Sequence, residues 1–341
     1  MAARNANIDA MRLVAALGVI ALHSGTYPEL PGDLGGILTG LFRWCVPFFY
    51  VVTGYYLTPE GARFPTVTLT RLLRPASVFA VAWLLYLPLL IARSGVAALG
   101  PRTLIEGTHF HLWYLSGLVV SLLVLEGLRG LGSRRLAIGV AALIVVACFA
   151  ASLNYTLTAT GYDLIVLTRE FIGVPCILAG AAYRRFAARP AARHRAILRA
   201  GLLLLVVEIV ALNLFGKSYR DMQWGLSTPV IALGLFGTAL TAKRTAPEWM
   251  ARLGREESLG IYVWHPAFMI PAAALLGGAW IHPPGTLESL PLWALTAVLT
   301  LLGLRLLGRA PRLRALADGD LRALSRESEP DGDGTGSSGQ S

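Results

Sequence analysis

The chain has 341 residues, of which 55% are hydrophobic and 15% charged, and its formal net charge is +10. An average soluble domain is roughly 45–50% apolar and 25% charged, so this composition excludes an ordinary soluble protein and indicates a membrane protein. The positive charge is explained by membrane topology, as described below, and we expect no nucleic-acid partner.

Apolar segments recur along the chain at the length needed to cross a lipid bilayer, which is about 20 residues for a helix. By this rule the sequence predicts ten spans, at residues 8–26, 35–57, 75–92, 110–128, 136–153, 164–183, 199–215, 226–242, 258–277 and 290–308. The predicted fold class is therefore an all-α polytopic membrane protein with about ten transmembrane helices. The membrane domain would occupy residues 1–308, and residues 309–341 would form a tail that is basic and then disordered.

Lysine and arginine residues are distributed unequally between the two sets of connecting loops. If the N-terminus lies inside, the cytoplasmic loops and flanks contain 24 of the 30 lysine and arginine residues. Such an excess is typical of the cytoplasmic side of membrane proteins. We therefore expect both termini in the cytoplasm. The many arginines and alanines are typical of a GC-rich bacterial genome, which favours a bacterial inner membrane.

The first span contains three ionisable side chains, Asp9, Arg12 and His23. At about 100° per residue, the steps from Arg12 to His23 make three turns and about 20° more, so both lie on one helix face about 16 Å apart. Ionisable groups within a span usually face a polar interior and mark a functional path. For Asp9 and Arg12, an ion pair at the helix start is the alternative.

Five motifs along the chain resemble those of the membrane-bound acyltransferase-3 family. They are Arg12 followed by ten residues and His23, then VPFFYVVTGY at 46–55, RLLRP at 71–75, HLWYL at 111–115 and SLGIYVWHP at 258–266. The likeness extends to the membrane domain of the serine racemases of vancomycin resistance. The resemblance implies an acyl-CoA donor reached from the cytoplasm and O-acylation of a hydroxyl at or beyond the outer face. Their soluble racemase domain has no counterpart here, so we do not expect racemase activity.

His23 has the chemistry that a catalytic base requires. Its imidazole can take the proton of an acceptor hydroxyl as this hydroxyl attacks the thioester carbonyl; a neutral histidine that packs against a neighbouring helix is the alternative. Arg12 would anchor a donor phosphate or orient the site. Arg71 and Arg74 precede the third span and are suited to bind the phosphates of coenzyme A, with positive-inside anchoring as the alternative.

Glu208 lies midway in an apolar span, where a carboxylate must be protonated, paired or turned toward a wet cavity. We expect it to act in catalysis, either by polarising His23 or by pairing with an arginine such as Arg43 or Arg169. The predicted substrate-binding residues are Asp9, Arg43, His111, Trp113, Arg169 and His265. Although His109 and His111 alternate as metal ligands can, no cysteine or acidic cluster accompanies them, so we expect no metal.

The sequence thus predicts an integral-membrane O-acyltransferase. It would move an acetyl or other short acyl group from acyl-CoA to a hydroxyl of a sugar, an envelope glycan or a secreted metabolite. The alternative is a permease for serine or another small polar solute, because a cavity with Arg12, Glu208 and His23 could bind a zwitterion. The expected partners are acyl-CoA, a hydroxyl-bearing acceptor and the lipid bilayer.

Overall fold

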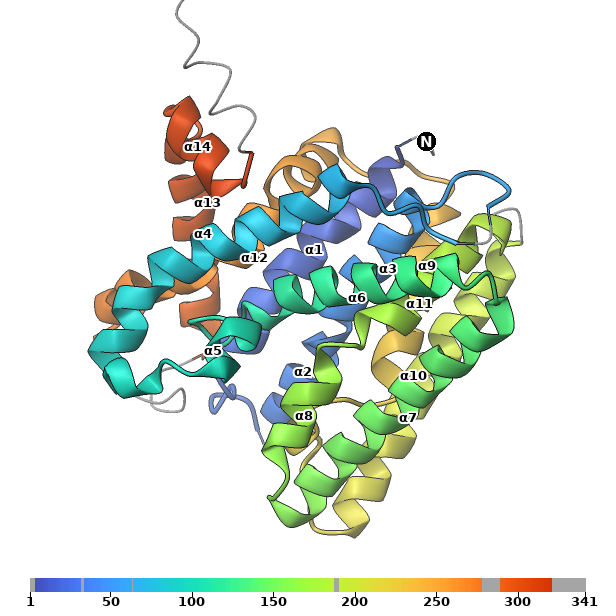
Figure 1. The fold of residues 1–341 in the computed structure, drawn as a ribbon. Helices are drawn as coiled ribbons and strands as arrows, with labels where there is room; N and C mark the ends of the chain where they lie inside the picture. Colours follow the sequence, from blue (N-terminus) through green and yellow to red (C-terminus); the bar gives the residue numbers. More distant parts are fainter. Residues whose placement is uncertain (1–3, 32–33, 63, 187–189, 278–288, 321–341) are drawn as a thin grey trace, which may run out of the picture.

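The computed structural model describes residues 4–31, 34–62, 64–186, 190–277 and 289–320, and all regular elements in these ranges are helices (Figure 1). Nine helical segments in them are long and apolar enough to cross a membrane. The predicted all-α polytopic membrane fold is therefore confirmed.

Seven of these segments are single helices. They are α1 (Ala6–His23), α4 (Leu69–Ser94), α6 (Trp113–Gly130), α7 (Arg134–Thr158), α10 (Ala191–Leu214), α12 (Glu248–Leu275) and α13 (Ser289–Leu307). The other two are built from consecutive helices. One joins α2 (Leu34–Leu41), η1 (Phe42–Trp44) and α3 (Cys45–Leu57), and the other joins α8 (Tyr162–Arg169) and α9 (Gly173–Phe186).

The segment predicted as a span at 226–242 is the 14-residue helix α11 (Ser227–Leu240). At about 1.5 Å per residue it is about 21 Å long, which is less than the roughly 30 Å of a bilayer core. The preceding chain, including η3 (Tyr219–Asp221), is folded against Glu208, so the helix begins only at Ser227. The remaining connectors are η2 (Val96–Ala98) and α5 (Pro101–Glu106).

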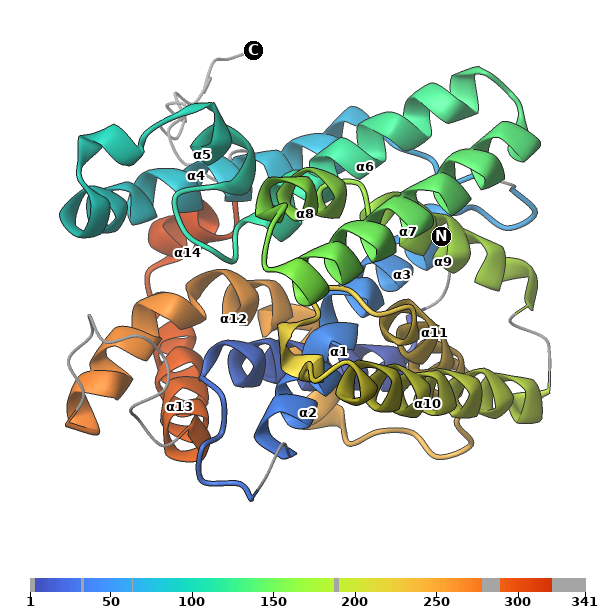
Figure 2. The ribbon, with the colours of Figure 1, turned by 90° about the horizontal axis from the view of Figure 1, so that it is seen from below.

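Helix α1 lies inside the bundle and packs against α12, α3, α11 and α13 (Figure 2). The Asn5 side chain caps its start by accepting hydrogen bonds from the amides of Asn7 and Ile8 at 2.9 and 3.2 Å. This cap satisfies two of the amides that a helix start leaves without a helical partner. The cap thereby defines where α1 begins.

Helices α1 and α12 approach so closely that their contact requires a glycine. A Cβ atom on Gly254 would lie 1.7 Å from the carbonyl oxygen of Asp9. Glycines at such crossings allow membrane helices to pack backbone against backbone. The crossing therefore sets the spacing between α1 and α12, the two helices that contribute most to the site described below.

The basic segment after residue 308 is folded in the part that the structure describes. It forms α14 (Pro311–Ala317), which packs against α4 and α13. Residues 321–341, where disorder is predicted, lie outside the described residues. The cysteines Cys45, Cys148 and Cys176 are free and buried.

We expect Gly254→Val to lower the melting temperature of the detergent-solubilised protein, because overpacking at a close helix contact typically costs about 1–3 kcal/mol. Gly139→Val is the matched control, because a Cβ atom on Gly139 of α7 would have no neighbour within 4 Å. Equal melting temperatures for the two variants would contradict the close α1–α12 contact.

Candidate active site

Four histidines gather at the end of α1. The rings of His23 and His265, from α12, are stacked with centroids 5.5 Å apart. His265 also contacts His111 at 5.4 Å, and His111 contacts His109 at 5.0 Å. Phe110 covers His23 edge-on at 4.6 Å. Residues predicted from three separate motifs, His23, His111 and His265, therefore meet at one place.

The proline after His265 explains how its ring is held. Pro266 has no amide hydrogen, so the carbonyl of Tyr262 loses its usual helical donor. The His265 side chain replaces this donor, with Nδ1 2.7 Å from the Tyr262 carbonyl and 3.1 Å from that of Ile261. A carbonyl only accepts, so Nδ1 carries the proton and Nε2 carries a lone pair. This Nε2 is buried and has no hydrogen-bond partner among the described residues.

His109 and His111 are held by hydrogen bonds at fixed ring nitrogens. Nε2 of His111 donates to the carbonyl of Val263 at 2.9 Å, so its Nδ1 accepts a hydrogen bond from Nδ1 of His109 at 2.9 Å. Burial, together with the neighbouring His265 and Arg93, lowers the pKa of His109 to about 3, so this ring stays neutral at physiological pH. His111, predicted to bind substrate, thus uses both ring nitrogens to hold its loop on α12.

Near the other end of α1, Asp9 lies between two arginines. Arg12 Nη1 is 3.3 Å from Asp9 Oδ1, and Arg255 Nη1 of α12 is 3.9 Å from Asp9 Oδ2. Asp9 is 1% exposed, whereas the Arg12 side chain keeps 21% of its surface accessible. Asp9 and Arg12 therefore form the ion pair that was the alternative prediction for them. This pair orients the Arg12 guanidinium and leaves part of its surface accessible.

The predicted pairing of Glu208 with Arg43 or Arg169 is wrong. Glu208 Oε2 accepts hydrogen bonds from the hydroxyls of Ser227 at 2.6 Å and Tyr219 at 3.2 Å, and Oε1 accepts from the amide of Ser227 at 3.2 Å. These three donors from α11 and η3 satisfy a buried carboxylate without a cation. Arg43 instead donates to the carbonyls of Gln223 and Arg220, at 3.0 and 2.7 Å.

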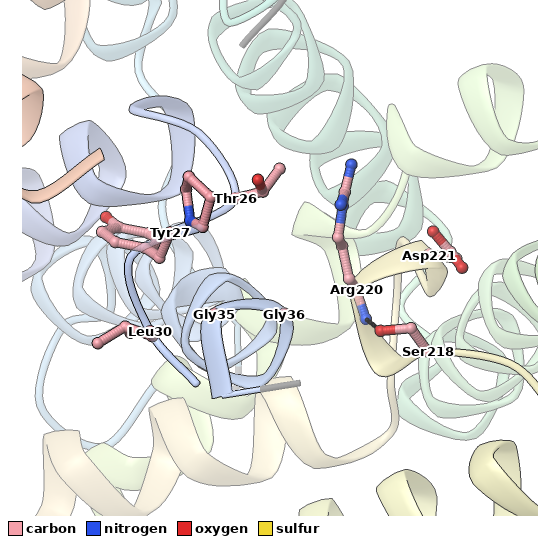
Figure 3. A pocket seen from close by; sticks show the side chains of 9 residues that line it. Thr26, Tyr27, Leu30, Gly35, Gly36, Ser218, Arg220 and Asp221 are labelled. Carbon is pink, nitrogen blue, oxygen red and sulfur yellow. Dashed lines mark hydrogen bonds between the residues drawn. The ribbon is translucent and has the colours of Figure 1, made fainter. Parts of the chain in front are cut away.

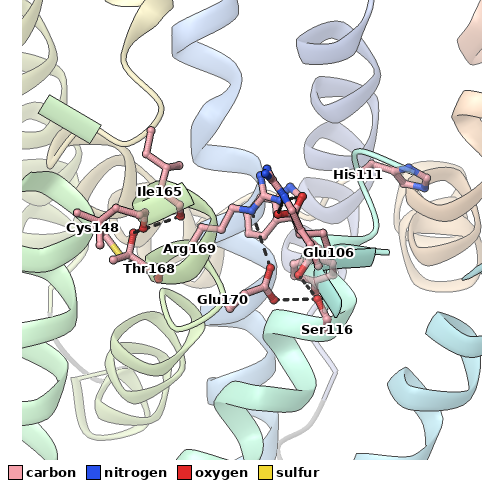
Figure 4. Close-up of polar contacts among 12 residues, drawn as sticks. Glu106, His111, Ser116, Cys148, Ile165, Thr168, Arg169 and Glu170 are labelled. Atoms are coloured by element: carbon pink, nitrogen blue, oxygen red, sulfur yellow. Dashed lines mark hydrogen bonds and ion pairs between the residues drawn. The ribbon is translucent and has the colours of Figure 1, made fainter. Parts of the chain in front are cut away.

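Arg169 belongs to a cluster of charged groups together with Glu106 and Glu170 (Figure 4). Its guanidinium lies 5.2 Å from the centre of the Trp113 ring, and its Nη2 is 3.2 Å from Oε2 of Glu106. Glu170, which is 2% exposed, accepts a hydrogen bond from Ser116 at 2.8 Å with Oε2. Its Oε1 and the Arg169 Nε are 3.8 Å apart, and neither has a hydrogen-bond partner among the described residues. A hydroxyl could accept from this Nε and donate to this oxygen.

A cavity of about 310 Å³ opens beside the loop that follows His23 (Figure 3). It is lined on one side by Thr26, Tyr27 and the start of α2, and on the other by Ser218, Arg220 and Asp221. Because Thr26 is three residues from His23, the cavity is adjacent in sequence to the histidine cluster. Its charged and hydroxyl-bearing lining suits a polar molecule.

The arginines predicted to bind coenzyme A lie in the first turns of α4. Arg71 Nη1 donates to the carbonyl of Thr66 at 2.9 Å, which holds this side chain against the preceding loop. Arg74 is exposed. Both arginines therefore lie at the start of α4. The Arg71 side chain is held by a hydrogen bond, and the Arg74 side chain is exposed.

Several residues of the site were missed by sequence reasoning. Glu170 follows Arg169 within an apolar span, so the argument that identified Glu208 could have found it. Glu106 and Arg255 lie outside the predicted spans, and their proximity to Arg169 and Asp9 depends on packing between distant helices. Within the described ranges, no group of three or more His, Cys, Asp or Glu side chains is arranged to hold a metal ion.

Comparisons with known proteins match most of this chain to one family. Residues 5–308 match the family Acyl_transf_3, described as an acyltransferase domain. A serine/alanine racemase of Enterococcus gallinarum is 32% identical over 140 residues, and an amino-acid racemase of Enterococcus faecalis is 30% identical over 139. Each match covers 37% of this chain and 20% of the relative, so the chain spans about a fifth of the length of these curated relatives. No solved structure matches.

The family match includes α1 with Arg12 and His23, as well as the α12 segment with His265. It thus covers both helices that form the histidine cluster, together with the other candidate spans that the structure describes. The chain belongs to the Acyl_transf_3 family, the family of an acyltransferase domain, and its candidate spans are those of a multi-pass membrane protein.

Proposed function

We propose that the protein transfers an acetyl or other short acyl group from cytoplasmic acyl-CoA to a hydroxyl group, with His23 as the general base. The observation that carries this proposal is the stacking of His23 on His265 within a cluster of histidines. An imidazole among neutral rings has no carboxylate partner to hold a proton on it, so it remains available as a base. The protein would act in a bacterial inner membrane with both termini in the cytoplasm.

In this mechanism, the acceptor oxygen attacks the thioester carbonyl while His23 takes the hydroxyl proton. The tetrahedral intermediate then collapses, the carbon–sulfur bond breaks, and the proton passes from His23 to the departing coenzyme A thiolate. The products are an ester and free coenzyme A. His265 would support the step because its unpaired Nε2 can accept a hydrogen bond from a second hydroxyl of the acceptor, while the attacking hydroxyl gives its proton to His23.

Arginines would hold the donor. Arg12 keeps an accessible guanidinium about 16 Å along α1 from His23, and the long arm of coenzyme A can bridge such a distance. Arg71 and Arg74 would bind its phosphates, for which arginine offers paired donors. Asp9 then has a supporting role, since its contacts with Arg12 and Arg255 fix the guanidinium that meets the donor.

The acceptor would be a hydroxyl-bearing molecule such as a sugar, an envelope glycan or a secreted metabolite. Two features support this class: the polar cavity beside Thr26, and the gap between Arg169 Nε and Glu170 Oε1 next to the face of Trp113. A hydroxyl can bridge a guanidinium and a carboxylate, and a sugar ring can lie on an indole. A zwitterion fits less well, because carboxylates already flank Arg169 and hydroxyls already satisfy Glu208.

We expect His23→Ala to abolish acyl transfer from labelled acetyl-CoA in isolated membranes, a loss of at least about 100-fold, as for removal of a general base. His194→Gln is the matched control, because His194 is a buried histidine that contacts Tyr183 outside the cluster. Size-exclusion profiles in detergent would verify that both variants fold. Undiminished transfer by the His23 variant would eliminate the mechanism.

Coenzyme A should raise the melting temperature of the purified protein, and free serine should not. A ligand present at 100 times its dissociation constant stabilises the folded state by about 2.7 kcal/mol. Arg74→Ala should weaken this effect, whereas Arg252→Ala, which breaks an exposed pair with Glu256, should leave it unchanged. Stabilisation by serine without any effect of coenzyme A would instead support a permease.

Replacing the charged pair beside Trp113 should impair acceptor use and spare donor binding. We expect Arg169→Lys and Glu170→Gln to reduce transfer about tenfold or more, since either change removes a group that a bridging hydroxyl would contact. Stabilisation by coenzyme A should persist in both variants. Loss of that stabilisation would show that the pair serves the donor or the fold.

A further inference from the structure

Residues 311–320, which include α14, contact the start of α4 closely. The Ser77 hydroxyl lies 2.8 Å from the carbonyl of Gly319 and 2.9 Å from the carbonyl of Arg74. Gly319 has a φ of +64°, and a Cβ atom there would lie 2.7 Å from both the backbone nitrogen and Cγ2 of Val78. Only glycine combines this backbone conformation with this close approach. The contact is therefore specific in both geometry and residue type.

Arg314 ties the same segment to α12. Its Nη1 donates to Glu257 at 2.8 Å, its Nη2 to the carbonyl of Glu256 at 3.1 Å, and its Nε to Asp318 at 2.8 Å. Both Arg314 and Glu257 are mostly buried, with side-chain exposures of 17% and 14%. These bonds raise the pKa of Arg314 although burial opposes this effect. One short segment thus links the start of α4 to the helix that carries Arg255 and His265.

Little of the surface of helix α4 is covered by other helices, so the contacts that it does make decide its position. Only 17% of its most apolar window is buried, compared with 22% for α7, α10 and α13 and 56% for α1. Figure 1 shows α14 beside α4 on the side of the bundle where α1 and α4 begin. The packing of Gly319 on Val78, which is 0% exposed, is one of the contacts that hold the first turns of α4.

We propose that residues 311–320 form a clamp that positions Arg71 and Arg74 for the phosphate-bearing part of acyl-CoA. This inference rests on the proposed function, because it assigns those arginines to the donor. Ser77, Arg314 and Gly319 are positioning residues that act through α4. The family match ends at residue 308, so the clamp is a feature of this chain beyond the matched region.

Two variants of the full chain test the clamp. Gly319→Val should push α14 off Val78, and Arg314→Ala should release it from Glu257, while Arg314→Lys should retain part of the contact. Gly132→Val is the matched control: Gly132 has a similar φ of +67°, but a Cβ atom there would have no neighbour within 4 Å. A general effect of strain at a positive φ would appear in both glycine variants, but loss of the clamp only in the first.

The first measurement is hydrogen–deuterium exchange of residues 69–78 in detergent, without ligand. We expect faster exchange in Gly319→Val and Arg314→Ala than in Gly132→Val, since only the first two release the start of α4. Unchanged exchange would overturn the clamp, whatever the protein binds.

The second measurement is the dissociation constant for coenzyme A, obtained from melting temperatures across a concentration series. We expect it to rise about tenfold in Gly319→Val and Arg314→Ala, equivalent to about 1.4 kcal/mol, and less in Arg314→Lys. Faster exchange with an unchanged constant would overturn the link to the donor. If coenzyme A fails to stabilise even the wild-type chain, the proposed function is wrong. The exchange measurement, which uses no ligand, would then show separately whether the clamp exists as a structural contact.

Discussion

The close contact between α1 and α12 is the constraint on which both ends of the site depend. Gly254 allows the two helices to meet backbone to backbone, and Arg255, the next residue, reaches Asp9. Farther along the same two helices, His265 meets His23. The helices therefore run parallel, and a single interface sets the positions of the guanidinium of Arg12 and the imidazole of His23. Any change in the crossing would move both groups together.

The lipid environment explains why so many polar side chains in this bundle are paired. An unsatisfied polar group in an apolar interior costs several kcal/mol, so a local partner stabilises a charge or hydroxyl that lies within a span. Glu208 accepts hydrogen bonds from three donors. The His265 side chain donates to the Tyr262 carbonyl in place of the amide hydrogen that Pro266 lacks. Against this background, Nε2 of His265 and Oε1 of Glu170 are among the buried atoms that have no hydrogen-bond partner within the described residues.

Much of the fold could be predicted from the sequence because each span is a local property. Hydropathy and length identified the long helices, and the periodicity of α1 placed Arg12 and His23 on one face. Helix α11 differs from its prediction in length: the sequence predicts a span at 226–242, whereas the helix covers Ser227–Leu240 and Glu208 accepts a hydrogen bond from its first amide. The segment after residue 308 was read by composition alone, and composition could not reveal that Gly319 fits against Val78.

The candidate site was harder to predict because its contacts join distant parts of the chain. Glu208 was expected either to polarise His23 or to pair with an arginine, since no sequence rule indicates that a serine and a tyrosine close to it in the chain will satisfy its carboxylate. The tautomer of His265 follows from Pro266, a local feature, but the ring it faces comes from the opposite end of the chain. The sequence thus identifies which residues are unusual for a membrane span. The packing of the helices decides which of these residues have a side-chain nitrogen or oxygen without a hydrogen-bond partner. In this protein that distinction separates His111, with both ring nitrogens hydrogen-bonded, from His265, whose Nε2 has no hydrogen-bond partner among the described residues.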